Sequence, residues 1–344
     1  MTDRMHRKTG GIILLCIISL AAVSQQKTLK VACIGNSVTY GYGLRNRDSA
    51  SYPVQLQHLL EPGYNVKNFG VSGSTLLKNG HRPYYKTAAF AGALAFAPDI
   101  AVIHLGLNDT DPRDWPDHRD EFAPDYAWLI DTIRKANPAV QIYICRLTPI
   151  FHDHPRFKSG TRNWFWEIQK LIPRIARANG TGLVDLHTPL YAHPELFADA
   201  LHPDETGAGI IAQTVYKSIT GNYGGLQLAL PFASHMVMQG NRPLRFYGTA
   251  DAGEAVTVAF DNQRKRIYAD QQGRWSAAFP AMPAGGPYQA GISTARKTIL
   301  LKDILIGEVW LCSGQSNMEF PLRNAVQSKQ YGNNPDIRLL RMAP

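Results

Sequence analysis

Four short segments, far apart in the sequence, carry side chains that could act as nucleophile, base or hydrogen-bond donor. Ser37 follows the apolar run 29–34, and Asn108 follows a second apolar run. Asp199 and His202 lie three residues apart, a spacing that brings a carboxylate and an imidazole to the same side of a turn. The aspartate can then hold one ring nitrogen and leave the other to accept a proton. A serine, a histidine base and an orienting aspartate are the machinery of acyl transfer.

Each of these residues also has an ordinary structural interpretation. Serines at strand ends commonly form turns, and most single histidines are structural or solvated. Gly73 can let backbone N–H groups approach a ligand closely, or it can simply form a turn. The side-chain amide of Asn108 can donate a hydrogen bond to an oxyanion. No Gly-x-Ser-x-Gly sequence is present, which excludes the nucleophile elbow of the α/β-hydrolases.

The elements that must position these residues alternate between strands and helices. Short runs that are apolar on both faces predict strands, and the amphipathic segments between them predict helices. This alternation implies crossover connections, a mostly parallel sheet covered on both faces, and functional groups at the strand ends. We expect strands at residues 29–34, 66–69, 100–105, 141–145 and 182–186, and helices at residues 52–60, 126–136, 164–178 and 207–219.

The pattern changes after Gly224. Short β-prone segments separated by turn residues predict a small antiparallel β-sandwich, with strands at residues 244–248, 255–260, 264–269 and 289–293. A further strand of the buried type is expected at residues 305–314, and the chain ends thirty residues later.

The amino-terminal residues 1–24 have the features of a signal peptide. A basic start is followed by the apolar run 12–22 and then by small residues ahead of Gln25. This run is shorter than the ~20 apolar residues that span a bilayer. We therefore expect an exported protein, periplasmic or secreted, with no stable membrane insertion once the signal is cleaved.

Composition argues against several other classes of function. The formal net charge is +9, but the basic residues are scattered, which indicates a solvated surface and not a nucleic-acid site. Cys33, Cys145 and Cys312 are widely spaced in apolar stretches, so we expect three buried thiols and no disulfide framework. His152 and His154 have no third ligand at a suitable spacing, so no metal site is expected.

Taken together and in this order, the four segments resemble the four blocks of the SGNH hydrolase superfamily, also called GDSL esterases. The matching residues are Gly35, Asn36 and Ser37; Gly73; Gly106, Leu107, Asn108 and Asp109; and Asp199 with His202. The resemblance covers residues 29–220 and implies a flavodoxin-like, three-layer α/β/α domain that needs no cofactor. Asn36 departs from the aspartate usual in the family. Because this residue is outside the triad, the change bears on loop geometry and not on catalysis.

The resemblance also implies a role for each residue. Ser37 attacks the acyl carbon, and His202 removes its proton and later protonates the leaving alcohol. Asp199 orients His202. The Ser37 and Gly73 backbone N–H groups and the Asn108 side chain hold the oxyanion.

The rest of the chain resembles sialate O-acetylesterases. The likeness runs from about residue 226 to the end and is most specific at residues 307–319, which resemble that family's nucleophile block and include Ser316. Ser316 is a possible second nucleophile, but no histidine follows it, so its site is incomplete. Either the chain is a piece of a longer two-enzyme protein, which we favour, or the second unit has decayed.

These observations predict a signal peptide (1–24), an SGNH hydrolase domain (25–223), a β-sandwich domain (224–304) and the incomplete start of a second catalytic domain (305–344). The expected function is removal of O-acetyl groups from a glycan or sialic acid. Tyr40, Tyr42 and Trp115 could stack on sugar rings, and the basic chain would suit a carboxylated sugar. Two alternatives stay open: a lysophospholipase or thioesterase of the same superfamily, and a non-catalytic glycan-binding protein.

Overall fold

The computed structural model describes residues 27–60, 62–155, 161–326, 332 and 334–340. The signal peptide expected at residues 1–24 lies outside this range. Among the described residues, no helix combines the length and the apolar character needed to cross a membrane.

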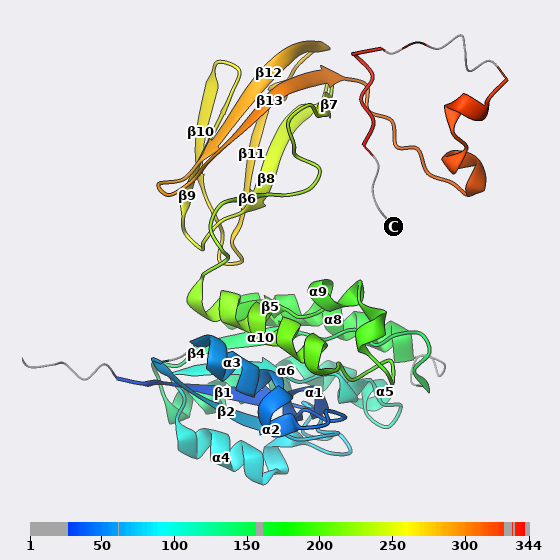
Figure 1. Cartoon of the computed structure of the whole chain (residues 1–344). Coiled ribbons are helices and arrows are strands. Elements are labelled where there is room, and N and C mark those ends of the chain that lie inside the picture. The colour runs from blue at the N-terminus through cyan, green and yellow to red at the C-terminus, as the bar shows by residue number, and fades with distance from the viewer. Residues whose placement is uncertain (1–26, 61, 156–160, 327–331, 333, 341–344) are drawn as a thin grey trace, which may run out of the picture.

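A five-stranded parallel sheet is the centre of the amino-terminal half (Figure 1). The strand order is β2-β1-β3-β4-β5, so the direction of winding reverses between β1 and β3, the place where doubly wound sheets bind ligands. The α/β class and the parallel sheet are therefore confirmed. The strands are β1 (Leu29–Gly35), β2 (Tyr64–Gly70), β3 (Ile100–His104), β4 (Gln141–Arg146) and β5 (Gly182–Asp185).

Helices cover both faces of this sheet (Figure 1). On one face α3 and α10 pack against each other, and on the other α6 lies between α4 and α8. These helices are α3 (Tyr52–Leu60), α4 (Ala88–Phe96), α6 (Phe122–Ala136), α8 (Thr161–Ala178) and α10 (Glu205–Thr220). Shorter helices are α1 (Ser37–Tyr40), α2 (Arg47–Ala50), α5 (Trp115–His118) and α9 (Thr188–Tyr191), with 3-10 turns at Tyr84–Lys86, Asn108–Thr110, Arg119–Glu121 and Pro194–Leu196.

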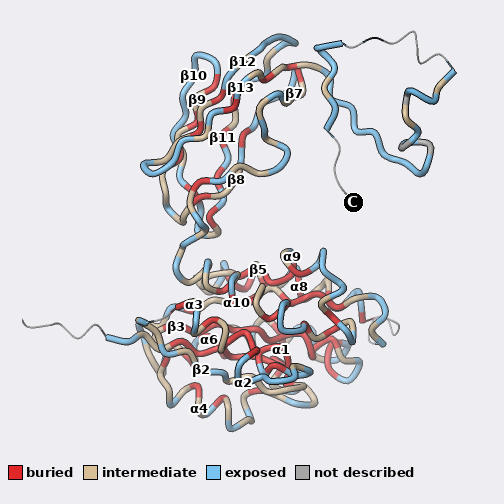
Figure 2. The backbone as a smooth tube through the Cα atoms, viewed as in Figure 1, coloured by how far each residue is buried: buried red, intermediate tan, exposed pale blue. Residues whose placement is uncertain are grey.

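The apolar runs predicted the buried strands better than the exposed one. All five residues of β3 are buried, and the core is a single cluster between the sheet and its helices (Figure 2). The expectation that every strand is apolar on both faces is wrong for β2, because β2 is at the edge of the sheet and part of it is exposed.

Two further sheets follow after residue 225, and their strands pair mostly antiparallel. Their buried side chains form one hydrophobic cluster, separate from that of the parallel sheet. The three-stranded sheet holds β6 (Gln227–Leu228), β8 (Pro243–Thr249) and β11 (Arg274–Ala281). The five-stranded sheet holds β7 (Val237–Gln239), β9 (Ala255–Phe260), β10 (Gln263–Tyr268), β12 (Gly285–Ser293) and β13 (Thr298–Gly307).

The strand expected at residues 305–314 is wrong at its carboxyl end. Residues 305–307 are the end of β13, where they pair with β7, and the chain leaves the sheet after Gly307. Trp310 and Leu311 are then 83% and 94% exposed, and the described part of the segment that follows extends away from the sheets (Figures 1 and 2). It contains only the 3-10 turns Ser316–Glu319 and Leu322–Asn324. The apolar run therefore continues beyond the end of β13.

A buried histidine at the end of β3 predicts acid sensitivity. His104 is fully buried, its Nε2 accepts a 3.3 Å hydrogen bond from the Thr148 N–H, and burial lowers its pKa to about 4. Above pH 6.5 the ring is neutral in both the folded and unfolded chain and has no effect on stability. As the pH falls from 6.5 to 4, the unfolded chain binds a proton that the folded chain does not, so about 3 kcal/mol of stability is lost.

The test compares the wild type with His104→Gln, whose amide oxygen can still accept from Thr148. Urea unfolding at pH 7 and pH 4.5 should show a smaller loss of stability in the variant, by about 2 kcal/mol. All other titrating groups are the same in the two proteins, so their contributions to the change in unfolding free energy cancel in the comparison. Equal losses in the two proteins would show that His104 does not resist protonation.

Candidate active site

The first candidate residue, Ser37, stands where β1 turns into α1. Asn36 caps this helix, because its side-chain oxygen accepts a 3.0 Å hydrogen bond from the Val38 N–H. Position 35 needs glycine for a steric reason, because a Cβ there would lie 2.1 Å from the Thr39 hydroxyl oxygen. The turn thus fixes the Ser37 backbone against the end of the sheet. The amide nitrogen of Asn36 is buried and has no hydrogen-bond partner among the described residues.

The structure brings Ser37, His202 and Asp199 into one hydrogen-bonded chain. His202 Nε2 lies 2.8 Å from Ser37 Oγ, although the two residues are 165 positions apart, and His202 Nδ1 lies 2.6 Å from Asp199 Oδ2. The other Asp199 oxygen accepts from the Leu201 and His202 N–H groups at 3.0 and 2.7 Å. The carboxylate therefore fixes both the ring and the turn that carries it.

The charge on Asp199 is favoured by these same contacts. Partial burial acts to raise the pKa of Asp199, but hydrogen bonds from the His202 ring and from the His202 and Leu201 N–H groups outweigh it, so the pKa is lowered. An ionised carboxylate accepts from His202 Nδ1–H and leaves Nε2 as the acceptor facing Ser37. Such an arrangement can draw a proton from the serine hydroxyl.

Two of the three candidate oxyanion donors, Gly73 and Asn108, lie on loops that are tied together. Asn108 starts the 3-10 turn after β3, and its amide donates a 3.0 Å hydrogen bond to the Ser74 carbonyl. The buried Asp109 carboxylate accepts from the Leu76 and Leu77 N–H groups at 3.0 and 2.8 Å. Burial raises the pKa of Asp109 to about 7, although these N–H groups act to lower it.

The loop that carries Gly73 is also tied to the nucleophile's strand. The Val71 N–H donates to the Gly35 carbonyl at 2.9 Å, and the Ser74 N–H donates to the Val71 carbonyl. Gly73 has φ +78°, a left-handed conformation that favours glycine. Its backbone N–H is therefore held in a fixed turn next to the ends of β1 and β3.

Residues 33–210, just over half of the chain, match the GDSL-like lipase/acylhydrolase family. The chain belongs to this family. The resemblance to the GDSL esterases is therefore confirmed, and the enzyme class is that of the serine esterases.

Curated relatives of this GDSL-family chain include two kinds of acetylesterase. It is 36% identical over 213 residues to an acetylxylan esterase of Xylanibacter ruminicola, covering 57% of this chain and 44% of that protein. It is 32% identical over 107 residues to a sialate O-acetylesterase of Rattus norvegicus, covering 28% and 20%. The chain thus spans less than half the length of these relatives. A crystal structure of a carbohydrate acetylesterase from Sinorhizobium meliloti is 17% identical, with 57% and 100% coverage and a TM-score of 0.46.

The three aromatic residues singled out in the sequence of this GDSL-family chain have different surroundings. The Tyr42 ring lies 4.7 Å from the His202 ring and is 54% exposed. Tyr40 is partly exposed and carries the Arg47 guanidinium 4.1 Å from its ring centre. Trp115 is 1% exposed, and its Nε1 donates to Glu167, so the expectation that it could stack on a sugar is wrong.

The second candidate nucleophile and the cysteines lie outside this GDSL-family site. Ser316 is exposed in the carboxyl-terminal segment, and no bond joins its hydroxyl to a histidine or aspartate in the described part of the chain. Cys33 and Cys145 are buried as expected, but Cys312 is exposed, because it follows the point where the chain leaves β13.

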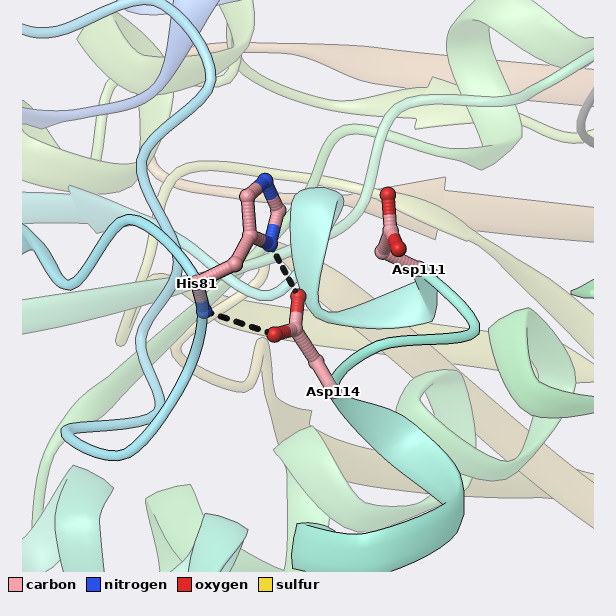
Figure 3. A group of neighbouring side chains, drawn as sticks. All are labelled: His81, Asp111 and Asp114. Atoms are coloured by element: carbon pink, nitrogen blue, oxygen red, sulfur yellow. Dashed lines mark hydrogen bonds and ion pairs between the residues drawn. The ribbon is translucent and has the colours of Figure 1, made fainter.

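One cluster of metal-ligand type was not expected from the sequence. His81, Asp111 and Asp114 lie near one another beside the GDSL-family site loops (Figure 3). Asp114 accepts from both the His81 N–H and the His81 ring at 2.7 Å, and Asp111 pairs with Arg113 at 2.8 Å. The bonds between His81 and Asp114 hold the two loops together, so the cluster is explained as a structural anchor of these loops. His152 lies 3.1 Å from Asp153 and, like His154, belongs to no group of three ligands among the described residues.

Proposed function

We propose that this chain removes O-acetyl groups from glycans by a Ser–His–Asp mechanism, after export from the cytoplasm. The observation that carries the proposal is the chain of two short hydrogen bonds, 2.8 Å from Ser37 to His202 and 2.6 Å from His202 to Asp199. The family supplies the class of reaction, and the acetylxylan and sialate esterase relatives suggest the acetyl group and the sugar.

In this mechanism the Ser37 oxygen forms a bond to the acetyl carbonyl carbon while His202 Nε2 takes the hydroxyl proton. Asp199 stabilises the imidazolium that results. The carbonyl oxygen becomes an oxyanion and accepts from the Ser37 and Gly73 N–H groups and the Asn108 amide. Collapse breaks the ester bond, and His202 gives its proton to the departing sugar oxygen. Water then attacks the acetyl-enzyme with His202 again as base, which releases acetate and regenerates Ser37.

The surroundings of the triad support a sugar as the leaving group. The exposed ring of Tyr42 packs against the His202 ring, where it offers an apolar face to a sugar beside the departing oxygen.

The test of this function is the pattern of substrates. Purified protein should release acetate from acetylated xylan or from O-acetylated sialoglycans and should hydrolyse p-nitrophenyl acetate faster than its long-chain homologues. A preference for long acyl chains would support a lysophospholipase or thioesterase. Glycan binding that is unchanged in Ser37→Ala, with no ester hydrolysis in the wild type, would support a non-catalytic binding protein.

The oxyanion role of Asn108 gives a separate prediction. Asn108→Ala should lower kcat for acetate release by about 10²–10³-fold, because the developing negative charge loses a fixed donor. KM should change little, since the ground-state carbonyl bonds weakly. The matched control is Asn79→Ala, which removes an exposed amide that bonds Glu121. Equal kcat in Asn108→Ala and the wild type would remove Asn108 from the oxyanion hole.

The same proposal extends to the layout of the chain. Residues 25–223 form the hydrolase domain, and a β-sandwich domain follows from residue 224. Because β13 runs without a break to Gly307, we place the end of this second domain there and not at residue 304. The remaining residues are the incomplete start of a second catalytic unit with Ser316 at its nucleophile position. The exposed side chains of Trp310, Leu311 and Leu339 support this, since a complete domain would bury them.

A further inference from the structure

Arg82 lies on a segment whose backbone is held on both sides. The preceding residue, His81, is bonded through its N–H and its ring to Asp114, which is fully buried (Figure 3). Arg82 itself accepts from the Thr75 N–H through its carbonyl at 2.9 Å. Tyr84 is buried, and its hydroxyl donates to the Phe69 carbonyl at 2.6 Å. The position of the Arg82 Cα is therefore set by the fold.

The Arg82 guanidinium lies over Gly73, the glycine whose N–H is proposed to hold the oxyanion. A Cβ built on Gly73 would be 2.7 Å from Arg82 Nη1 and 3.2 Å from Cζ. The side chain thus occupies the space that glycine leaves open at the edge of the candidate site. A planar cation therefore lies next to Gly73, one of the residues proposed to hold the oxyanion.

This guanidinium has no hydrogen bond or ion pair within the described part of the chain, and Arg82 is exposed. Two acidic residues of the neighbouring loop are already paired, Asp114 with His81 and Asp111 with Arg113. An arginine held at a site but unpaired there is available to a ligand, and its five donors match a carboxylate or phosphate in a bidentate arrangement.

We propose that Arg82 is a specificity residue that binds the carboxylate of an acidic sugar, so that the preferred substrates are O-acetylated uronic or sialic acids. The inference rests on the proposed function, because it concerns the sugar from which the acetyl group is removed. Binding of a carboxylate by Arg82 acts equally on ground state and transition state, so it lowers KM and leaves kcat little changed.

The experiment measures acetate release from two acids, an O-acetylated glucuronic acid and an O-acetylated sialic acid, each against its neutral carboxamide. The measured quantity is the ratio of kcat/KM for acid and carboxamide. In the wild type this ratio should exceed one for at least one pair, and the pair shows which acid is preferred. Arg82→Gln should lower that ratio by about 10- to 100-fold, mainly through KM, as expected for loss of a charge-assisted bidentate contact. Arg82→Lys should restore part of it.

The control is Arg264→Gln on β10, which changes the net charge by the same amount and should keep the wild-type ratio. A ratio that is equal in Arg82→Gln and the wild type would overturn the inference. So would an equal fall in kcat for acid and carboxamide, which would indicate that Arg82 serves the oxyanion. If the wild type releases acetate neither from these four compounds nor from acetylated xylan, the proposed function itself is wrong, and this inference is wrong with it.

Discussion

Replacing Ser37 with alanine is expected to lower kcat for acetate release by about 10⁵–10⁶-fold, the scale of nucleophile loss in serine hydrolases. Alanine removes the oxygen that forms the acetyl-enzyme and leaves His202 with no proton to take. The residual rate should come from the oxyanion donors acting on water. The measurement is acetate release from acetylated xylan and p-nitrophenyl acetate, with circular dichroism to establish that the variant is folded.

Two companion variants make this result specific. Ser316→Ala should leave the rate unchanged, because the Ser316 hydroxyl bonds no histidine or aspartate in the described chain. The double variant Ser37→Ala, His202→Ala should be no slower than Ser37→Ala alone, since residues that act as one unit are not additive. Loss of activity in Ser316→Ala with activity retained in Ser37→Ala would show that the working site is the second one.

The second large effect concerns Asp199. Asp199→Asn should lower kcat by about 10⁴-fold, the effect of placing the base in its wrong tautomer. The wild-type Oδ1 accepts from two N–H groups, Leu201 and His202, so the amide oxygen of asparagine must occupy that position. The amide NH₂ then faces His202 Nδ1, which has to become an acceptor. The proton moves to Nε2, and the ring can no longer take one from Ser37.

The matched control for this variant is Asp204→Asn. Asp204 caps α10 by accepting from the Gly207 N–H at 2.8 Å, and asparagine caps helices equally well. Its activity and melting temperature should stay close to those of the wild type, so a loss of kcat in Asp199→Asn cannot be attributed to amide substitution in this loop. Asp199→Asn with wild-type kcat across pH 6–9 would remove Asp199 from the proposed triad.

The parallel sheet could be predicted because its signal is local. The run that became β3 is apolar at nearly every position, and α3 begins and ends at the residues that the pattern predicted. α4 was missed because Ala88–Phe96 is apolar on all sides and so lacks an amphipathic pattern. The strand at 305–314 was drawn too long because an apolar run indicates burial but does not specify what buries it.

In the candidate site, too, contacts between residues close in the sequence could be predicted, and contacts between distant residues could not. The Asp199–His202 contact follows from a three-residue spacing within one turn. The Ser37–His202 contact depends on the strand order of the whole sheet and had to be inferred from family resemblance. Nothing in the sequence placed Arg82 over Gly73, because that proximity arises from a segment held by Asp114 and by Tyr84. Likewise, tryptophan is a residue type that stacks on sugars, but the sequence did not show that Trp115 is buried.

The buried carboxylate of Asp109 has a consequence for the energetics of acetyl transfer. Its bonds to Leu76 and Leu77, with the bond from Asn108 to Ser74, join the loops after β2 and β3 before any ester arrives. Under the proposed mechanism the loops that carry the Gly73 and Asn108 donors are therefore held in place before the charge develops. Little reorganisation energy of these loops is then needed at the transition state.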